Sequence, residues 1–166
     1  MSEMCGLREV IGAAWAAVAA AAEARNIELE MGVPDHLECP MERARIERVF
    51  SNLFENAIDA MRSGGKVMIG SETDHDNILV RVDDTGPGIS PLVRSRLFQP
   101  FVTAGKKNGL GLGLALSRQA LLDHGGDIWV EGDGPGARFC LRLPKERSTM
   151  PNDASKLNGD GVVAGD

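Results

Sequence analysis

The sequence predicts an α/β protein, a two-layer sandwich in which a mixed, mostly antiparallel sheet packs on about three helices. Two observations lead to this prediction. Long segments with helical periodicity alternate along the chain with short segments of strand-like alternation. Turns rich in glycine, proline and aspartate separate these segments. The 166 residues are enough for one domain with its own core and some additional chain.

Charge and cysteine content exclude several classes of function. The formal net charge of −6 and the pI of about 5.1 argue against nucleic acid or an anionic membrane as the main partner. The cysteines are Cys5, Cys39 and Cys140, an odd number in unrelated sequence contexts. Their spacing predicts neither a disulfide framework nor a metal site, and it favours a reducing, cytoplasmic location.

Residues 1–25 are expected to form an alanine-rich helix that is part of the domain or leads into it. The apolar run from Val10 to Ala22 is shorter than the roughly 20 residues that cross a bilayer. It also has no basic leader of the signal-peptide type. One apolar face is predicted, because large side chains recur at spacings of four, four and three: Leu7, Ile11, Trp15 and Val18.

The remaining elements are predicted from hydrophobic periodicity and from the turn residues that separate the periodic segments. Residues 26–31 and 36–40 are predicted to be extended, and a helix is predicted over 42–61, where Ser63-Gly64-Gly65 stops it. Further along the chain we predict an antiparallel pair of strands at 66–74 and 77–84 and a short helix at 91–97. A second helix is predicted at 114–124, and a hairpin at 126–144 closes the domain. Residues 145–166 are polar without periodicity, so we expect a disordered tail after a domain at 26–144.

The helix predicted over 42–61 carries a separate polar stripe. Its core face is predicted to comprise Ile46, Val49, Phe50, Leu53, Ala57 and Ala60. Asn52, Asn56 and Asp59 lie on another edge, with Glu55 at its margin. Mid-helix asparagine does little for helix stability, whereas its amide oxygen suits a Mg²⁺ ion that also holds phosphate and water. A solvated helix face is the alternative interpretation of this stripe.

The segment DDTGPGI, Asp83 to Ile89, begins where a strand is predicted to end. A carboxylate at that place can accept a hydrogen bond from an exocyclic amine such as that of adenine. The neighbouring Gly86 and Gly88 would let a flat ring approach the backbone. We assign this role to Asp84, and we expect Asp83 to face the same side as Arg81.

The run GLGLGL, Gly109 to Leu114, places glycines at alternate positions directly before a helix. Backbone N–H groups there can approach a phosphate, although neither a Rossmann nor a P-loop pattern is present. Upstream, Phe98 and Phe101 would anchor a short loop that can close over a ligand. Lys106 and Lys107 in this loop could meet phosphate charge or serve only as exposed, solubilising residues.

Four motifs in this order resemble the ATP-binding family shared by sensor histidine kinases, gyrase B, a heat-shock chaperone and the mismatch-repair ATPases. NLFENAIDAM resembles the N box, DDTGPGI the first glycine box, LFQPF the F box and GLGLGL the second glycine box. The C-terminal third up to Pro144 resembles the histidine kinase catalytic domain in particular. The resemblance implies the Bergerat fold for the domain.

The resemblance also implies roles for individual residues. Asn56 would hold Mg²⁺, Asn52 would support the phosphates and the metal, and Asp84 would bind the adenine amine. The segment between Phe101 and Asn108 would be the ATP lid. The nucleotide-binding residues implied in all are Asn52, Asn56, Asp59, Asp84, Gly86, Gly88, Ile89, Phe101, Thr103, Lys106, Lys107, Gly109, Leu110, Gly111, Leu112, Gly113 and Leu114.

Two positions depart from the family pattern. Leu110 stands where many kinases have threonine or serine, which removes a hydroxyl near the phosphates. Ala137 stands in GARF where GT-x-F is usual, which weakens the case for a water-mediated contact to adenine. Backbone amides and Asp84 would remain in both cases.

The expected function is that of a catalytic domain of a two-component sensor histidine kinase, with ATP and Mg²⁺ as cofactors. Hydrolytic relatives resemble one another in having glutamate where this chain has Asn52, and an amide cannot act as a base. Asn52, Asn56 and Glu55 are the candidate catalytic residues, and Glu55 is the one that could support hydrolysis instead. The alternatives are a serine kinase of the anti-sigma-factor type, a stand-alone ATPase and a non-catalytic ATP sensor.

The phosphoacceptor is expected on another domain. The family motif resembles His-Glu/Asp-x-x-x-x-Pro, and none of His36, His75 or His124 fits it. We therefore expect transfer to a histidine on a separate dimerisation domain, in the same parent protein or in trans, with a response regulator downstream. The domain itself is expected to be cytoplasmic, with no direct membrane contact, although its parent protein could be membrane-bound.

Overall fold

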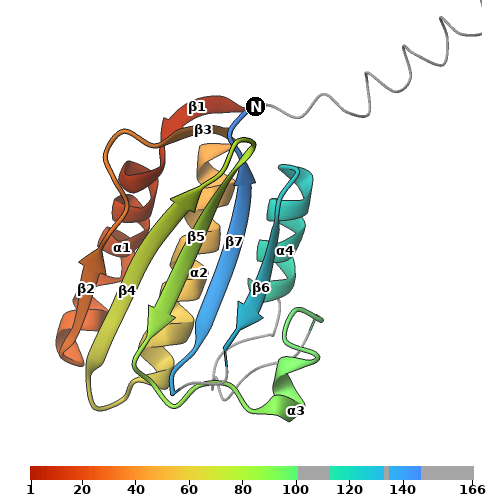
Figure 1. Cartoon of the computed structure of the whole chain (residues 1–166). Coiled ribbons are helices and arrows are strands. Elements are labelled where there is room, and N and C mark those ends of the chain that lie inside the picture. Colours follow the sequence, from red (N-terminus) through yellow and green to blue (C-terminus); the bar gives the residue numbers. More distant parts are fainter. Residues whose placement is uncertain (101–112, 133–134, 147–166) are drawn as a thin grey trace, which may run out of the picture.

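A five-stranded sheet forms one layer of the computed structural model, and helices cover one of its faces (Figure 1). The structure describes residues 1–100, 113–132 and 135–146. The predicted tail therefore lies almost wholly outside the described residues. The elements are β1 (Glu3–Gly6), α1 (Leu7–Ala24), β2 (Ile27–Met31), β3 (Glu38–Met41), α2 (Arg43–Ala60), β4 (Gly65–Thr73), β5 (Asn77–Asp84), α3 (Pro91–Arg94), α4 (Gly113–Asp123), β6 (Asp127–Glu131) and β7 (Arg138–Pro144).

The large sheet has the order β2-β4-β5-β7-β6. Only the β2–β4 pair is parallel, which confirms the prediction of a mixed, mostly antiparallel sheet. Along β5, Ile78, Val80 and Val82 are buried and alternate with half-buried residues. This period of two places one apolar face of the strand against the helices and leaves Asn77, Leu79, Arg81 and Asp83 on the other face.

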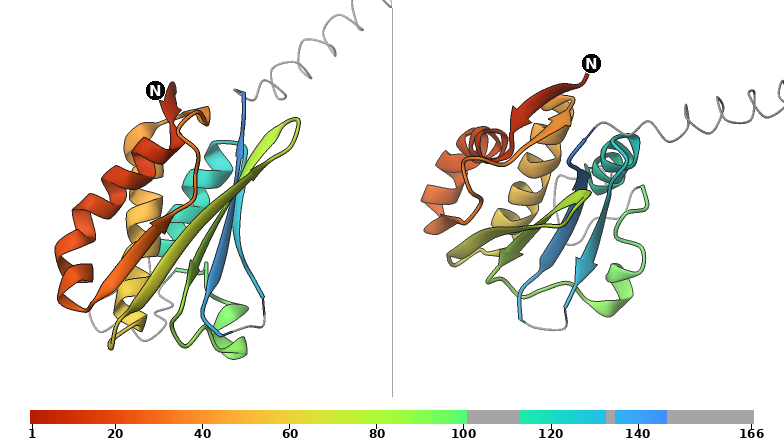
Figure 2. Two further views of the ribbon diagram at one scale, coloured as in Figure 1. Left: turned by 60° about the vertical axis from the view of Figure 1, so that its left-hand side comes forward. Right: turned by 45° about the horizontal axis from the view of Figure 1, so that its top comes forward.

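The helical layer consists of α1, α2 and α4, which lie side by side on the sheet with α2 in the middle (Figures 1 and 2). The ring of Trp15 in α1 meets the ring of Phe54 in α2 edge-on, with centroids 5.1 Å apart. Among the described residues, no helix has both the length and the hydropathy that crossing a membrane requires.

The buried arc of α2 is wider than the predicted one, and the prediction for Ala60 was wrong. Phe54 and Ile58 are buried as well, because α2 contacts α1 on one flank and α4 on the other in addition to the sheet. Ala60 is exposed, since it lies at the C-terminal end of α2 and faces the turn after β5. The other five predicted core positions of this helix are buried.

A second, two-stranded sheet pairs β1 with β3 in antiparallel register. The prediction of a helix over residues 1–25 was wrong at residues 3–6, which form β1, because four residues are too short to show the alternation of a strand. Figure 1 shows this small sheet at one end of the molecule and α3, with the end of β5, at the other.

Candidate functional site

Asp84 is the last residue of β5 and lies at the edge where the sheet meets the helical layer. It is paired with Val67 of β4, two positions beyond the buried Val82, so its side chain points to the helical face. Its Oδ1 accepts hydrogen bonds from the backbone N–H of Gly86, at 2.9 Å, and of Ala137, at 3.2 Å. Among the described residues Oδ2 receives no hydrogen bond, so it can accept one from a ligand.

The environment of Asp84 disfavours its charge. Burial raises the pKa of this carboxyl above its usual value, and the nearby Asp83 carboxylate adds to the effect, while the two backbone N–H groups act against it. A partly buried carboxylate of this kind gains from a further hydrogen-bond donor. A flat, amine-bearing ring supplies such a donor without adding charge.

Asp83 faces the opposite side of the sheet from Asp84 and is paired with a cation. Arg138 of β7 donates two hydrogen bonds to its carboxylate, at 2.7 and 3.1 Å. Arg81, the only nearby counter-charge in the sequence, instead pairs with Glu72 at 3.1 Å. Sequence reasoning missed Arg138 because the contact depends on the β5–β7 register, in which Asp83 and Arg138 are opposite.

Glycines allow the chain to approach Asp84 closely. A Cβ on Gly86 would lie 3.0 Å from Cγ of Met61 and 3.1 Å from Oδ1 of Asp84, with the exposed Ala60 at 3.8 Å. Gly136 has φ +88°, and a Cβ there would overlap the Asp84 carbonyl oxygen. The carboxylate is therefore bordered closely by glycine backbone and by the apolar side chains of Met61 and Ala60.

Replacing Gly86 by alanine tests this surface. The added methyl group would crowd Asp84 and Met61, so we expect nucleotide affinity to fall about tenfold and the free energy of unfolding to fall by about 1–3 kcal/mol, the usual cost of overpacking. Gly70→Ala is the matched control, because nothing lies within 4 Å of a Cβ there. Isothermal titration of both variants decides the point; equal losses of affinity in the two would contradict it.

The polar stripe of α2 continues the site towards α4. Nδ2 of Asn52 lies 3.4 Å from the carbonyl oxygen of Gly113 and 3.4 Å from Oγ of Ser117, which is buried. Asn52 of the N box thus contacts the first turn of α4, where the second glycine box ends. Asn56 is half-buried on the same edge, whereas Asp59 and Glu55 are exposed.

The donor set fits magnesium and a nucleotide. Neutral amide oxygens can complete the coordination of a Mg²⁺ ion whose charge is already balanced by phosphate. The nucleotide's base would lie against Asp84 and Gly86. No group of three or more metal-ligating histidine, cysteine or acidic residues occurs in the described part of the chain, so the phosphates themselves would supply the anionic ligands.

The remaining predicted residues divide into two sets. Ile89 and Leu114 pack against the core with partly buried side chains, and Gly88 adopts φ +82° against Gly136. Phe98, which precedes the predicted lid, meets Phe139 edge-on at 6.4 Å between ring centroids. The predicted residues that lie outside the described ranges are Phe101, Thr103, Lys106, Lys107, Gly109, Leu110, Gly111 and Leu112.

Two features of the site were not predicted. Thr85 connects β4 to the turn, since its Oγ1 accepts from the Lys66 N–H at 3.0 Å and its N–H donates to the Lys66 carbonyl at 3.1 Å. Ala137, where the family has threonine, contacts Asp84 through its own N–H and carbonyl. The backbone part of that contact therefore does not depend on the side chain at position 137.

Comparison with known proteins identifies the family. Residues 41–147 match the sequence profile of the histidine kinase-, DNA gyrase B- and HSP90-like ATPases. The chain belongs to this family. Within it, the alginate biosynthesis sensor protein KinB of Pseudomonas aeruginosa is 41% identical over 125 residues, which are 74% of this chain and 21% of that protein. The C4-dicarboxylate transport sensor protein DctB of Rhizobium meliloti is 41% identical over 114 residues, 68% of this chain and 18% of that protein.

Solved structures of this ATPase family agree with the fold. The catalytic domain of histidine kinase ThkA superposes with a TM-score of 0.79 at 32% identity, covering 88% of this chain and 99% of that one. The mycobacterial sensor histidine kinase MprB superposes with a TM-score of 0.77 at 27% identity, covering 89% of this chain and 100% of that one. The predicted Bergerat fold and histidine kinase-type catalytic, ATP-binding domain are thereby confirmed. The chain spans about a fifth of the length of the curated relatives it matches.

Proposed function

We propose that this domain binds ATP with Mg²⁺ and presents the γ-phosphate to a histidine on a separate dimerisation domain. The observation that carries the proposal is the partly buried Asp84 carboxylate, fixed by two backbone N–H groups beside the glycine backbone at Gly86. In the proposal, Oδ2 of Asp84 accepts a hydrogen bond from the adenine amine. Adenine is then selected over rings that carry a carbonyl at that position.

Asn56 is proposed to hold the magnesium ion, and Asn52 to align the phosphate end of the site. The bound metal would neutralise charge on the phosphates during transfer. Asn52 donates towards the start of α4, and among the described residues its Oδ1 has no hydrogen-bond donor. These contacts join α2 to the helix that begins at Gly113, within the second glycine box.

Transfer rather than hydrolysis is supported by the side chains present. Asn52 is an amide and cannot take a proton from water at neutral pH. Glu55 is exposed on α2, whereas Asn52 and Asn56 are half-buried. A water molecule bound near the phosphates would therefore find no positioned base among these candidate residues.

The acceptor is proposed to lie on another domain. His36 and His75 are exposed residues of turns, and His124 is buried after α4, where Nε2 accepts from the Glu42 N–H at 2.9 Å. One ThkA structure is a complex with the response regulator protein TrrA, and this chain matches 42% of that kinase chain at 31% identity. We propose a response regulator as the downstream partner here as well.

The metal assignment is tested by Asn56→Ala. We expect affinity for ATP in the presence of Mg²⁺ to fall about tenfold or more, while the weaker affinity measured with EDTA stays unchanged. Ser51→Ala is the matched control, because its hydroxyl bonds only to the Arg48 carbonyl of the same helix. If Asn56→Ala weakened binding equally with and without Mg²⁺, the residue would act on the nucleotide and not on the metal.

A further inference from the structure

Two cysteines that are far apart in the sequence lie opposite each other in the small sheet. Cys5 of β1 pairs with Cys39 of β3, and both are free thiols. Their side chains are 6% and 0% exposed, and opposite residues of an antiparallel pair share one face of the sheet. The third thiol, Cys140, lies on β7 in the other sheet.

The strand register sets the spacing of the two thiols. Leu7 N–H donates to the Leu37 carbonyl at 2.9 Å, which continues the β1–β3 pairing by one residue and lies two residues beyond the Cys5–Cys39 pair. Cys5 and Cys39 are therefore a hydrogen-bonded pair, with Cα atoms about 5.5 Å apart, inside the range of about 4.4–6.8 Å for disulfides. Their Cβ atoms, about 5 Å apart, must approach by roughly 1 Å to reach disulfide geometry.

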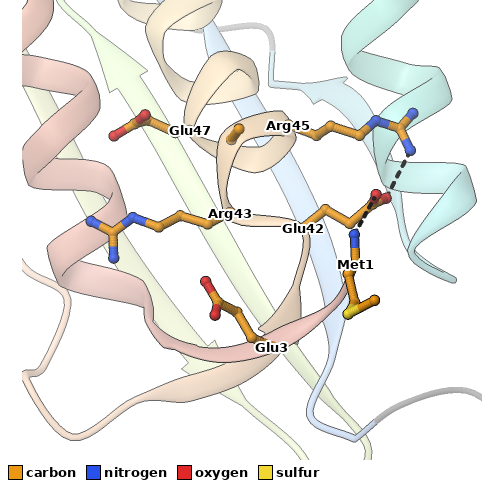
Figure 3. A pocket seen from close by; sticks show the side chains of 7 residues that line it. Met1, Glu3, Glu42, Arg43, Arg45 and Glu47 are labelled. Atoms are coloured by element: carbon orange, nitrogen blue, oxygen red, sulfur yellow. Dashed lines mark hydrogen bonds and ion pairs between the residues drawn. The ribbon is translucent and has the colours of Figure 1, made fainter.

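Strand β1 can make this movement. It has four residues, and a two-stranded pair is only marginally stable. Figure 3 shows Met1 and Glu3, the first residue of β1, beside the start of α2, where the Met1 amino group meets Oε1 of Glu42 at 3.3 Å.

We infer that Cys5 and Cys39 are a modification site, a dithiol that forms a reversible disulfide with small-molecule disulfides such as oxidised glutathione. The Cys5 thiolate attacks one sulfur of the oxidant, which forms a mixed disulfide and releases one glutathione thiol. The Cys39 thiolate then attacks Sγ of Cys5, which forms the protein disulfide and releases the second glutathione thiol. Two protein thiols lose two electrons and two protons, and one small disulfide becomes two thiols.

Reaction requires β1 to open. Burial raises the pKa of Cys39 to about 11, with a smaller contribution from the adjacent Cys5. Burial and the Glu3 carboxylate also raise the pKa of Cys5, although the Arg43 guanidinium acts against them. Both groups are therefore protonated thiols in the closed sheet, and the thiolate forms when β1 separates. The approach of the Cβ atoms strains the bond, which keeps it easily reduced. This site is independent of the nucleotide site and of the proposed function.

The full chain can be tested in native buffer with an excess of oxidised over reduced glutathione. We expect the intact mass to fall by two hydrogens, and one thiol of three to remain for alkylation after unfolding. Peptide mapping should join Cys5 to Cys39, and dithiothreitol should restore all three thiols.

Cys140→Ser is the matched variant and should still form the bond. Cys5→Ser and Cys39→Ser should form none, and each should retain its two remaining thiols or a single glutathione adduct. Three free thiols in the wild-type protein at equilibrium would overturn the inference. So would a disulfide involving Cys140, or a glutathione adduct on Cys5 that Cys39 does not resolve. The wild-type mapping alone decides this even where a serine variant fails to fold.

Discussion

Asp84→Asn is expected to weaken ATP binding by tenfold or more and, at the same time, to stabilise the folded protein. The asparagine can still accept from the Gly86 and Ala137 N–H groups through Oδ1. It presents an NH₂ group in place of Oδ2, so the bond to the adenine amine is lost. A hydrogen bond to a charged group contributes about 1.5–3 kcal/mol, which corresponds to a loss of about 10- to 150-fold.

The stability effect has a defined pH dependence. Because the folded-state pKa of Asp84 is raised, the folded protein binds a proton more readily than the unfolded chain. The wild type therefore loses stability as pH rises from the ordinary aspartate value, 3.8, through the raised pKa. The advantage of the Asn variant should be largest at neutral pH and vanish below that window.

Urea unfolding at several pH values, together with nucleotide titration, measures both effects. Asp83→Asn is the matched control, because it removes the neighbouring carboxylate on the other face of the sheet and breaks only the ion pair with Arg138. It should leave ATP affinity unchanged. If Asp84→Asn bound ATP as tightly as the wild type, the assignment of Asp84 to adenine would be wrong.

Phe54→Ala is expected to have the largest effect on stability. Phe54 is fully buried, packs edge-on against Trp15 and lies 6.4 Å from the Phe50 ring. Truncating such a side chain costs about 3–5 kcal/mol, the sum of lost apolar burial and the remaining cavity. The loss falls on the contact between α1 and α2, away from Asp84.

Chemical denaturation measures this loss directly. Leu92→Ala serves as the control, since Leu92 is 75% exposed and its truncation should change stability by less than about 0.5 kcal/mol. A loss below about 1 kcal/mol for Phe54→Ala would show that α1 does not pack on α2 as described. That result would separate the N-terminal helix from the domain.

The local pattern of the sequence predicted most of the elements and the faces on which the candidate site residues lie. Alternation predicted β4 and β5, and the same period of two places Asp84 and Asp83 on opposite faces. The stripe of Asn52 and Asn56 followed from the helical period. In each case the information lies within one element, where side-chain direction depends only on residue number.

The features that escaped prediction depend on how elements meet. Phe54 and Ile58 are buried because α2 has neighbours on both flanks, which its own periodicity does not reveal. Arg138 reaches Asp83, and Cys5 reaches Cys39, only through strand register. Ala60 is exposed because the helix ends over the turn at Gly86. Contacts between elements that are distant in the sequence determine all of these features, and no single segment of the sequence encodes such contacts.

The fate of the γ-phosphate tests the central claim most directly. The purified chain is incubated with γ-labelled ATP and Mg²⁺, alone and with an added dimerisation domain that carries a phosphoacceptor histidine, with Asp84→Ala as control. We predict an acid-labile adduct on the added domain, little free phosphate from the chain alone, and neither product in the control. Steady release of free phosphate by the chain alone, abolished in the control, would contradict the account and assign the domain to hydrolysis.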